Sequence, residues 1–372
     1  MHKKVVIVLA LICLLAASCT MIETGAPSDK QESQTAPEVV ENAPKEEAAD
    51  DKAGFGATLK SVLSAGEVRC GTQDVSPAFG YVDSAGNYSG FDIDFCRVLA
   101  AALFGDVSKG TPVIVTGETR FPTLQNGDTD VLIRTTTYTF SRDVELGLSF
   151  PVIYFYDGQG IMVPKASGLS TLEDLNGAAI CMDSGTTTEA NIADAMTAAG
   201  LSYAPVVYEN NDDMFAAYEQ GRCDAVTGDR SALISGRAKL KVGDDHEILA
   251  ITLSKEPFSP GVRQGDDQWA DIIRWAFYVP VIAEEHGITS ANVDEIKVST
   301  KDPEVMRLLG LEGELGEKLG LSNDFAYNII KLVGNYGEIY EKSFGEDTST
   351  AMTRGLNSLW TDGGLIYAPP YR

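Results

Sequence analysis

A short pattern occurs twice in this chain and limits its possible folds more than any other feature of the sequence. The first copy is Leu124-Gln-Asn-Gly127-Asp-Thr-Asp130-Val-Leu-Ile, and the second is Tyr218-Glu-Gln-Gly221-Arg-Cys-Asp224-Ala-Val-Thr. Each copy reads as a helix end, a glycine that stops the helix, two residues, an aspartate and a strand. Strands alternate with helices around the first copy, which is typical of βαβ units in a parallel sheet. The repeat therefore predicts two α/β lobes, and chance similarity between ordinary α/β units is the alternative.

Hydrophobic periodicity predicts the elements of these lobes. We expect strands at 67–71, 113–116 and 130–134, and helices at 91–104, 120–125, 267–283 and 325–344. Pro280 should kink or split the helix that contains it. Extended stretches at 150–163 and 248–254 flank the second copy and predict two hinge crossings. The prediction is thus an α/β fold in which each lobe is an open, mostly parallel sheet flanked by helices. Lobe 1 comprises 55–152 and 255–372, and lobe 2 comprises 153–254.

The charge balance of the chain excludes one class of partner. Its 372 residues include 29 Lys and Arg but 54 Asp and Glu, for a formal net charge of −25. Because neutralising phosphates needs a basic surface, we exclude nucleic acid as a partner. The three histidines are His2, His246 and His286. They are far apart in the sequence, which argues against a metal centre, and we expect no cofactor.

The N-terminus reads as an export signal. His2-Lys3-Lys4 precedes an apolar run, Val5 to Ala17, that is shorter than the ~20 residues needed to cross a bilayer. We assign 1–18 to a signal peptide, with a buried helix as the alternative. Leu15-Ala-Ala-Ser-Cys19 resembles the lipobox of bacterial lipoproteins, in which the cysteine is lipidated; ordinary cleavage is the other reading. Residues 19–54 are acidic and lack aromatic side chains, so we expect a flexible tether.

The four cysteines beyond the N-terminal segment favour disulfides in an exported protein. Four cysteines allow three pairings, and spacing alone does not choose among them. Each lobe opens with a strand in which a cysteine is followed closely by Gly and Thr. If the lobes are copies of one unit, the pairs are Cys70 with Cys96 and Cys181 with Cys223, one bridge in each lobe.

Polar and charged residues follow the predicted strands at positions where α/β sheets bind ligands. The first strand end delivers Arg134 to Arg142, a run rich in Thr that ends in a guanidinium suited to a carboxylate. Ser184 to Glu189 reads as a helix N-terminus, which attracts anions. Asp229 follows the strand of the second copy and would accept a cation. Together these groups describe the α-amino acid zwitterion. The alternatives are that Glu189 completes a capping box with Thr186 and that the Arg is a surface residue.

Several motifs, in this order, resemble those of solute-binding proteins of polar or general L-amino acid ABC transporters. The motifs are Gly71-Thr72, Gly90-Phe91-Asp92-Ile93-Asp94, Thr135-Thr136-Thr137, Ser141-Arg142, Phe150-Pro151, Tyr156-Asp157-Gly158-Gln159-Gly160, Gly185-Thr186-Thr187 and Gly221-Arg222-Cys223-Asp224. The likeness runs from about Ser64 to Pro370. The resemblance implies a two-lobed fold of the periplasmic-binding-protein type (type II), with the ligand cleft between the lobes. It also implies capture of a free L-amino acid, delivery to a membrane permease with its ATPase, and a monomeric exported protein.

The resemblance also assigns roles to individual residues. Arg142 would clamp the α-carboxylate with help from the backbone N–H groups of Thr137 and Thr187, beside Thr186. Thr135 and Asp229 would hold the α-ammonium group. Arg120 could meet an acidic or amide side chain. Gln73 and Ser76 replace the Asp and the aromatic residue that shape the pocket in many family members, so lysine or arginine specificity is not expected to carry over.

Three other functions compete with this reading. Dehydratases acting on cyclic amino acid precursors share the scaffold, but no histidine lies near the predicted cleft, and we expect no enzyme here. An amino acid-sensing receptor module would need a separate signalling partner. A surface adhesin would not need a two-lobed cleft. We place the protein outside the cytoplasmic membrane or in the periplasm, anchored through Cys19.

Overall fold

The computed structural model describes residues 56–372. The predicted signal peptide at 1–18, the predicted tether at 19–54 and the lipidation site at Cys19 lie outside the described residues. No helix in the described part is both long enough and apolar enough to span a bilayer.

The first lobe is built on a small parallel sheet with the strand order β5-β1-β6. These strands are Gly110–Ile114, Val68–Thr72 and Val131–Leu132. The predicted helices 91–104 and 120–125 are confirmed as α2 (Phe91–Phe104) and α3 (Arg120–Gln125). Eleven of the residues of α2 are buried, which explains why its periodicity was a clear signal in the sequence. The other elements before the first crossing are α1 (Ala57–Ala65), β2 (Val75–Ser76), β3 (Gly80–Val82), β4 (Tyr88–Ser89), η1 (Val107–Lys109), α4 (Phe140–Glu145) and β7 (Leu148–Ser149).

The second lobe is built on a mixed sheet with the strand order β10-β9-β11-β8-β12. Its parallel part consists of β10 (Ala204–Tyr208), β9 (Ala179–Asp183) and β11 (Ala225–Asp229). Two antiparallel strands complete it, β8 (Phe155–Pro164) and β12 (His246–Ile248). The remaining elements are η2 (Lys165–Ser167), η3 (Glu173–Leu175), α5 (Thr187–Ala198), α6 (Asn211–Glu219), α7 (Arg230–Arg237) and η4 (Gly243–Asp245).

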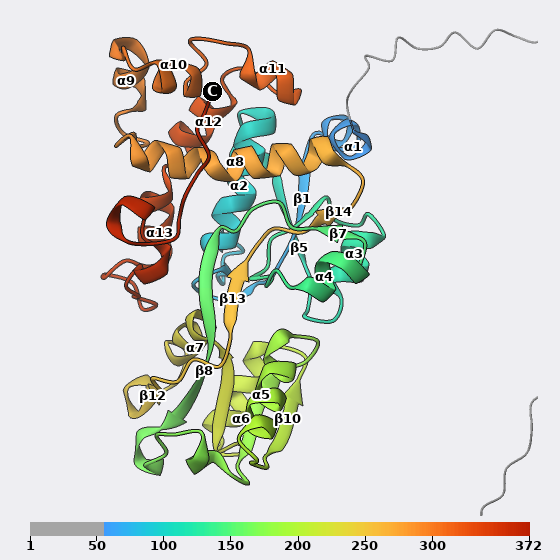
Figure 1. The fold of residues 1–372 in the computed structure, drawn as a ribbon, viewed down its shortest axis with the longest axis vertical. Coiled ribbons are helices and arrows are strands. Elements are labelled where there is room, and N and C mark those ends of the chain that lie inside the picture. Colours follow the sequence, from blue (N-terminus) through green and yellow to red (C-terminus); the bar gives the residue numbers. More distant parts are fainter. Residues whose placement is uncertain (1–55) are drawn as a thin grey trace, which may run out of the picture. The chain divides into compact units, whose positions relative to one another are not determined.

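Two chain segments connect the lobes, and Figure 1 shows them side by side as β8 and β13 (Lys255–Phe258). The second crossing was predicted at 248–254, but the strand that pairs with the start of β8 is β13. Between β12 and β13 the chain still follows β8, since Leu249 N–H donates to Ile161 O and Leu253 N–H to Gln159 O. Between the last residue pair of β12 and the first of β13, six residues (249–254) therefore lie opposite three (159–161), and this bulge interrupts the ladder.

After β14 (Val262–Arg263) the chain returns to the first lobe in a series of helices. They are α8 (Asp267–Glu285), α9 (Val293–Ser299), α10 (Pro303–Leu308), α11 (Leu315–Leu319), α12 (Phe325–Leu332) and α13 (Tyr336–Phe344), followed by η5 (Gly355–Asn357) and η6 (Trp360–Asp362). The prediction that Pro280 splits α8 is wrong, because the helix continues through it with Pro280 buried. Packing on both sides of the proline holds the helix together despite the lost hydrogen bond.

The helical stripe predicted at 325–344 is two helices rather than one. Gly334 has φ 114° between α12 and α13, and Asn335 then caps α13 in a capping box with Glu338. The apolar stripe continues across the break because both helices pack against the same core. Periodicity alone could not reveal the break, whereas the Gly-Asn pair followed by Glu was a helix-start signal that we missed.

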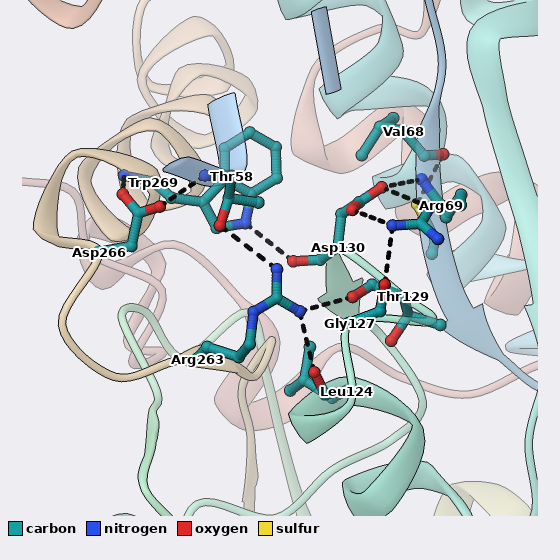
Figure 2. A network of polar contacts seen from close by, with 11 residues as sticks. Thr58, Val68, Arg69, Leu124, Gly127, Thr129, Asp130, Arg263, Asp266 and Trp269 are labelled. Atoms are coloured by element: carbon teal, nitrogen blue, oxygen red, sulfur yellow. Dashed lines mark hydrogen bonds and ion pairs between the residues drawn. The ribbon is translucent and has the colours of Figure 1, made fainter. Parts of the chain in front are cut away.

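The two copies of the repeat adopt the same local structure. Asp130 accepts a hydrogen bond from Arg69 N–H, and Asp224 accepts one from Ala179 N–H, so each aspartate ties its strand start to the neighbouring strand. Figure 2 shows that Asp130 also forms an ion pair with Arg69 and that its carbonyl accepts a hydrogen bond from Trp269 Nε1. In the same network Arg263 donates to the carbonyl of Leu124, near the end of α3, and to that of Thr129. The aspartate of each copy thus anchors the start of one strand, β6 in the first lobe and β11 in the second.

Both predicted disulfides are confirmed, Cys70–Cys96 and Cys181–Cys223. The two cysteine strands, however, are not equivalent. Cys70 lies opposite Val131 in the first sheet, whereas Ile180, not Cys181, holds the matching place opposite Ala225. Because a shift of one residue turns a side chain to the other face, Cys70 bonds to α2 and Cys181 bonds to the loop before β11. The predicted pairs, one in each lobe, are therefore right, although the two bridges join different elements.

Removal of the first bridge should destabilise the protein measurably. With a sequence separation of 26, the chain-entropy account gives about 3–4 kcal/mol for Cys70–Cys96. The Cys70→Ser, Cys96→Ser double variant should therefore melt roughly 5 °C or more below the parent in calorimetry. An unchanged melting midpoint in the double variant would contradict this bridge.

Candidate functional site

A cavity lies between the two lobes, with residues from both in its wall. Its volume, counted as the space open to the centre of a water molecule, is about 40 Å³. This is a few times the ~10–15 Å³ that one water needs on the same measure. The first lobe contributes Gln73, Ser76, Phe79, Arg120, Arg134, Thr135 and Thr137. The second contributes Asp183, Thr186, Thr187, Thr188, Asn211, Met214, Phe215, Thr227, Gly228, Asp229, Ala232 and Leu233. Of the eight predicted binding residues, seven line this cavity, and Arg142 does not.

The lobes also contact each other around the cavity. Ser76 Oγ lies 3.2 Å from Ser235 Oγ, and Arg120 donates to the carbonyl of Gly185 at 3.3 Å. Arg134 and Asp183 form an ion pair at 4.0 Å. Each of these pairs joins the first lobe to the second, so the lobes are closed over the cavity.

A strained turn forms the first-lobe side of the cavity. Thr135 has φ 38°, the left-handed region that β-branched residues rarely adopt. Its N–H donates to Asp92 Oδ2 at 3.1 Å, and Tyr154 OH donates to Asp92 Oδ1 at 2.6 Å. Burial raises the pKa of Asp92 to about 6, although both hydrogen bonds and Arg134 act to lower it. Asp92 therefore stabilises the turn through its hydrogen bond to Thr135 N–H. This contact explains the acidic residue at the start of the buried helix α2.

Asp92 should make stability fall as the pH rises from about 4 to 6. The ordinary pKa of an aspartate is 3.8, so in this range the unfolded chain has already lost the proton of Asp92. The folded protein still keeps that proton. Linkage then lowers the free energy of unfolding with rising pH, by about 2–3 kcal/mol in total. Urea titrations at pH 4 and pH 6 should show a smaller fall for Asp92→Asn than for the parent or for the exposed control Asp347→Asn. Equal falls in all three proteins would contradict this assignment.

Two buried arginines line the cavity. Arg120 and Arg134 are 3% and 6% exposed. Burial lowers the pKa of both guanidinium groups, most strongly for Arg120, where Arg142 and Arg134 add to the effect. No described residue accepts a hydrogen bond from the buried Nε of Arg120. An unpaired buried donor of this kind is costly and favours an anionic or acceptor group in the cavity.

Arg142 lies next to the cavity rather than in its wall. It is on α4, and its Nη1 donates to Thr137 O at 2.8 Å while its guanidinium stacks over the Phe121 ring. Burial lowers its pKa to about 10, whereas Glu256 and Asp229 act to raise it. The predicted carboxylate clamp is thus within electrostatic reach of the predicted ammonium partner, and its hydrogen bond to Thr137 connects it to the cavity wall.

Asp229 provides the negative side of the cavity. It lies at the end of β11, directly before α7, and its Oδ1 is buried without a hydrogen-bond partner among the described residues. Burial raises the pKa of Asp229 well above its ordinary value, and the nearby carboxylates of Asp157 and Glu256 raise it further. A cation bound at Asp229 would relieve this unfavourable environment.

The N-terminus of α5 closes the second-lobe side. Thr186 precedes the helix, but its Oγ1 donates to Asp183 O, so the alternative capping box with Glu189 does not form. Thr187 is the first helical residue, and its hydroxyl lies 3.4 Å from that of Thr137 in the first lobe. The two threonines predicted to act together are therefore neighbours across the cavity.

Sequence reasoning gave no role to three charged residues of this region. Arg134 opens the run that follows the first strand and lies two residues after β6, and Asp183 ends β9, so the rule applied to Asp229 would have given both a place at the cavity. Glu256 on β13 had no signal, because its contacts depend on how the crossings place it. The described histidines lie elsewhere: His246 bonds to Tyr218, and His286 ends α8.

The site combines opposite charges around a small space. Arg120 carries an unpaired donor on one wall, and Asp229 carries an unpaired acceptor on the other. Groups so arranged suit a small ligand that bears both an anion and a cation.

Comparison with known proteins agrees with this geometry. The chain is 48% identical to the glutamate/glutamine/aspartate/asparagine-binding protein BztA of Rhodobacter capsulatus, over 86% of this chain and 95% of that protein. It is also 48% identical to the general L-amino acid-binding periplasmic protein AapJ of Rhizobium johnstonii, over 86% and 94%. A periplasmic binding protein of an ABC transporter from Brucella ovis, solved with glutathione bound, superposes with a TM-score of 0.83 at 46% identity, over 85% of this chain and 99% of that one. The family model for bacterial extracellular solute-binding proteins, family 3, matches residues 68–279, and the chain belongs to that family.

Proposed function

We propose that this protein binds one free L-amino acid between its lobes and delivers it to the permease of an ABC transporter for uptake. The observation that carries the proposal is that two oppositely charged residues of one closed cavity, Arg120 and Asp229, each keep a buried polar atom without a partner among the described residues. The α-ammonium of an amino acid supplies a partner for Asp229, and an oxygen of its side chain supplies one for Arg120. Charge-assisted hydrogen bonds of this kind contribute ~1.5–3 kcal/mol each.

The head of the amino acid would be held by residues from both lobes. Arg142 and the backbone N–H groups of Thr137 and Thr187 bind the α-carboxylate in this proposal. The guanidinium of Arg142 makes one hydrogen bond within the described chain, to Thr137 O, so its other N–H groups can serve a ligand. Asp229 and Thr135 hold the α-ammonium. These two residues lie the same number of positions after Asp224 and Asp130, at equivalent strand ends.

The side chain of the amino acid would meet Arg120, Gln73 and Thr186. A guanidinium can donate to either a carboxylate or an amide oxygen, so acidic and amide amino acids are the preferred class. The Arg134–Asp183 pair, with one residue from each lobe, adds a donor and an acceptor to the lining of the cavity. The name of the Rhodobacter relative, which covers glutamate, glutamine, aspartate and asparagine, supports this choice.

Closure would occur at the two crossings. We place the limits of lobe 2 at 153 and 254, in the coils before β8 and before β13. Rotation of the lobes about β8 and β13 would open the cavity and admit the ligand. Family members are exported solute-binding proteins, and we extend this to a monomer anchored outside the membrane by lipid on Cys19 and acting without catalysis.

A calorimetric screen tests this function. Protein stripped of endogenous ligand by unfolding and refolding should bind glutamate, glutamine, aspartate or asparagine, and lose binding when the amino group is acetylated or the α-carboxylate is esterified. Each analogue removes one charge of the zwitterion and leaves the side chain intact. Failure to bind any of the twenty amino acids, or equal binding of both blocked analogues, would reject the proposal.

A further inference from the structure

A buried glutamate sits on the crossing between the lobes. Glu256 is the second residue of β13 and pairs with Asp157 of β8 in the ladder. It is 1% exposed, although it is charged and lies on a segment that must bend if the lobes separate. A buried carboxylate persists only where several donors surround it. The identity of those donors therefore indicates what Glu256 does.

The donors come from both lobes. Glu256 Oε2 accepts from Thr137 Oγ1 of the first lobe at 2.5 Å and from Thr187 Oγ1 of the second lobe at 3.0 Å. Its Oε1 accepts from Asn191 Nδ2, also in the second lobe, at 2.8 Å. Ser254 Oγ, two residues earlier on the same crossing, completes the set. One carboxylate thus joins both lobes to the segment between them.

The position of these contacts relative to the cavity fixes their role. Thr137 and Thr187 line the cavity, whereas Glu256 and Asn191 do not. The hydroxyls of the two threonines are turned toward Glu256, behind the wall. Opening the lobes would separate Thr187 and Asn191 from Thr137, so the carboxylate cannot keep all its donors in an open protein.

We propose that Glu256 is a positioning residue that latches the lobes in the closed arrangement. It orients the two threonines against each other and slows reopening, without touching the ligand. The inference rests on the proposed function in one respect, namely that the closed cavity is the ligand-holding form. The latch itself belongs to the protein chain and operates with or without a ligand.

Three variants separate the latch from ordinary stabilisation. Glu256→Gln keeps the size of the side chain but removes its charge, and Asn191→Ala removes one cross-lobe donor outside the cavity wall. Ser254→Ala is the matched control, because it removes a donor to the same carboxylate that lies on the same crossing, two residues away, and so keeps its place when the lobes separate. Far-ultraviolet circular dichroism and melting curves should show all three folded.

Stopped-flow kinetics with the amino acid found in the screen supply the first readout. Dissociation should accelerate about tenfold in Glu256→Gln and in Asn191→Ala, the loss of about one charge-assisted hydrogen bond, with association changed less than about twofold. Ser254→Ala should keep both rates near those of the parent. The Glu256→Gln, Asn191→Ala double variant should dissociate no faster than Glu256→Gln alone, since the two groups act as one contact. Unchanged dissociation, or an equal change in Ser254→Ala, would overturn the latch.

Small-angle X-ray scattering without ligand supplies the second readout and does not depend on the proposed function. Glu256→Gln and Asn191→Ala should have a larger radius of gyration than the parent and Ser254→Ala, because more molecules are open. Identical scattering of all four proteins would overturn the latch even if amino acids bind. If no amino acid binds the parent, the proposed function fails, and scattering still decides the role of Glu256.

Discussion

Asp229→Asn should bind amino acids at least ~100-fold more weakly than the parent, and its ligand-free form should melt at a higher temperature. The first effect follows because the variant removes the charge opposite the ligand ammonium inside a closed cavity. Breaking one side of a buried ion pair typically costs ~3–5 kcal/mol. By the usual conversion this is a factor of more than about 100 in Kd, which isothermal titration calorimetry can measure directly.

The melting temperature should rise, although binding weakens, because of the surroundings of Asp229. Burial and two neighbouring carboxylates raise its pKa well above the ordinary value, so ionised Asp229 destabilises the ligand-free fold at neutral pH. A folded-state pKa above the unfolded value means that this residue favours folding at low pH and opposes it as the pH rises. Asparagine keeps the shape without the charge, and the gain in melting temperature should shrink below about pH 4.

These two signs together distinguish a binding residue from a structural one. Neutralising a structural aspartate, such as Asp130 with its ion pair to Arg69, should instead lower the stability of the protein. The exposed Asp347→Asn variant should change neither affinity nor melting temperature. Retention of affinity in Asp229→Asn would remove Asp229 from the ligand site, and a lower melting temperature would contradict the account of its charge.

The sequence predicted those elements whose signals are local. The helices α2 and α3 have the predicted bounds, because each buries apolar residues at helical spacing and each is followed by a clear stop. The stop is Gly105 after α2 and Asn126-Gly127 after α3. The sequence could not locate the bulge between β12 and β13, which depends on how β8 pairs with the returning chain. The continuity of α8 through Pro280 likewise depends on packing around the helix.

The candidate site was predictable where it follows the strand ends. Thr135 and Asp229 occupy equivalent ends because the repeat sets both strands in the same register. The role of Asp92 was less accessible, since it acts through a turn some 40 residues away in the chain, through the bond to Thr135 N–H. Glu256 shows the same limitation more strongly, because its donors come from both lobes and lie far from it in the sequence.

Replacement of the two arginines near the ligand should separate head recognition from side-chain recognition. Arg142→Met keeps an apolar stem against Phe121 but loses the guanidinium that donates to Thr137 O. Every amino acid that binds the parent should then bind ~10- to 150-fold more weakly, because all share the α-carboxylate and lose one or more charge-assisted hydrogen bonds. The effect should not depend on the side chain of the ligand.

Arg120→Met should instead weaken only ligands with acidic or amide side chains, by a similar factor, and leave alanine or serine nearly unchanged if these bind. Arg120 lines the cavity and its buried Nε has no partner among the described residues, so the variant loses a donor for a side-chain oxygen while the head contacts remain. Removal of this buried charge should not destabilise the ligand-free fold, because burial already lowers the pKa of Arg120. The exposed Arg222→Gln variant is the matched control and should bind like the parent. Calorimetry with four ligands on each variant decides the assignment: a uniform loss in Arg120→Met would place the α-carboxylate on Arg120, and a selective loss in Arg142→Met would exchange the two roles.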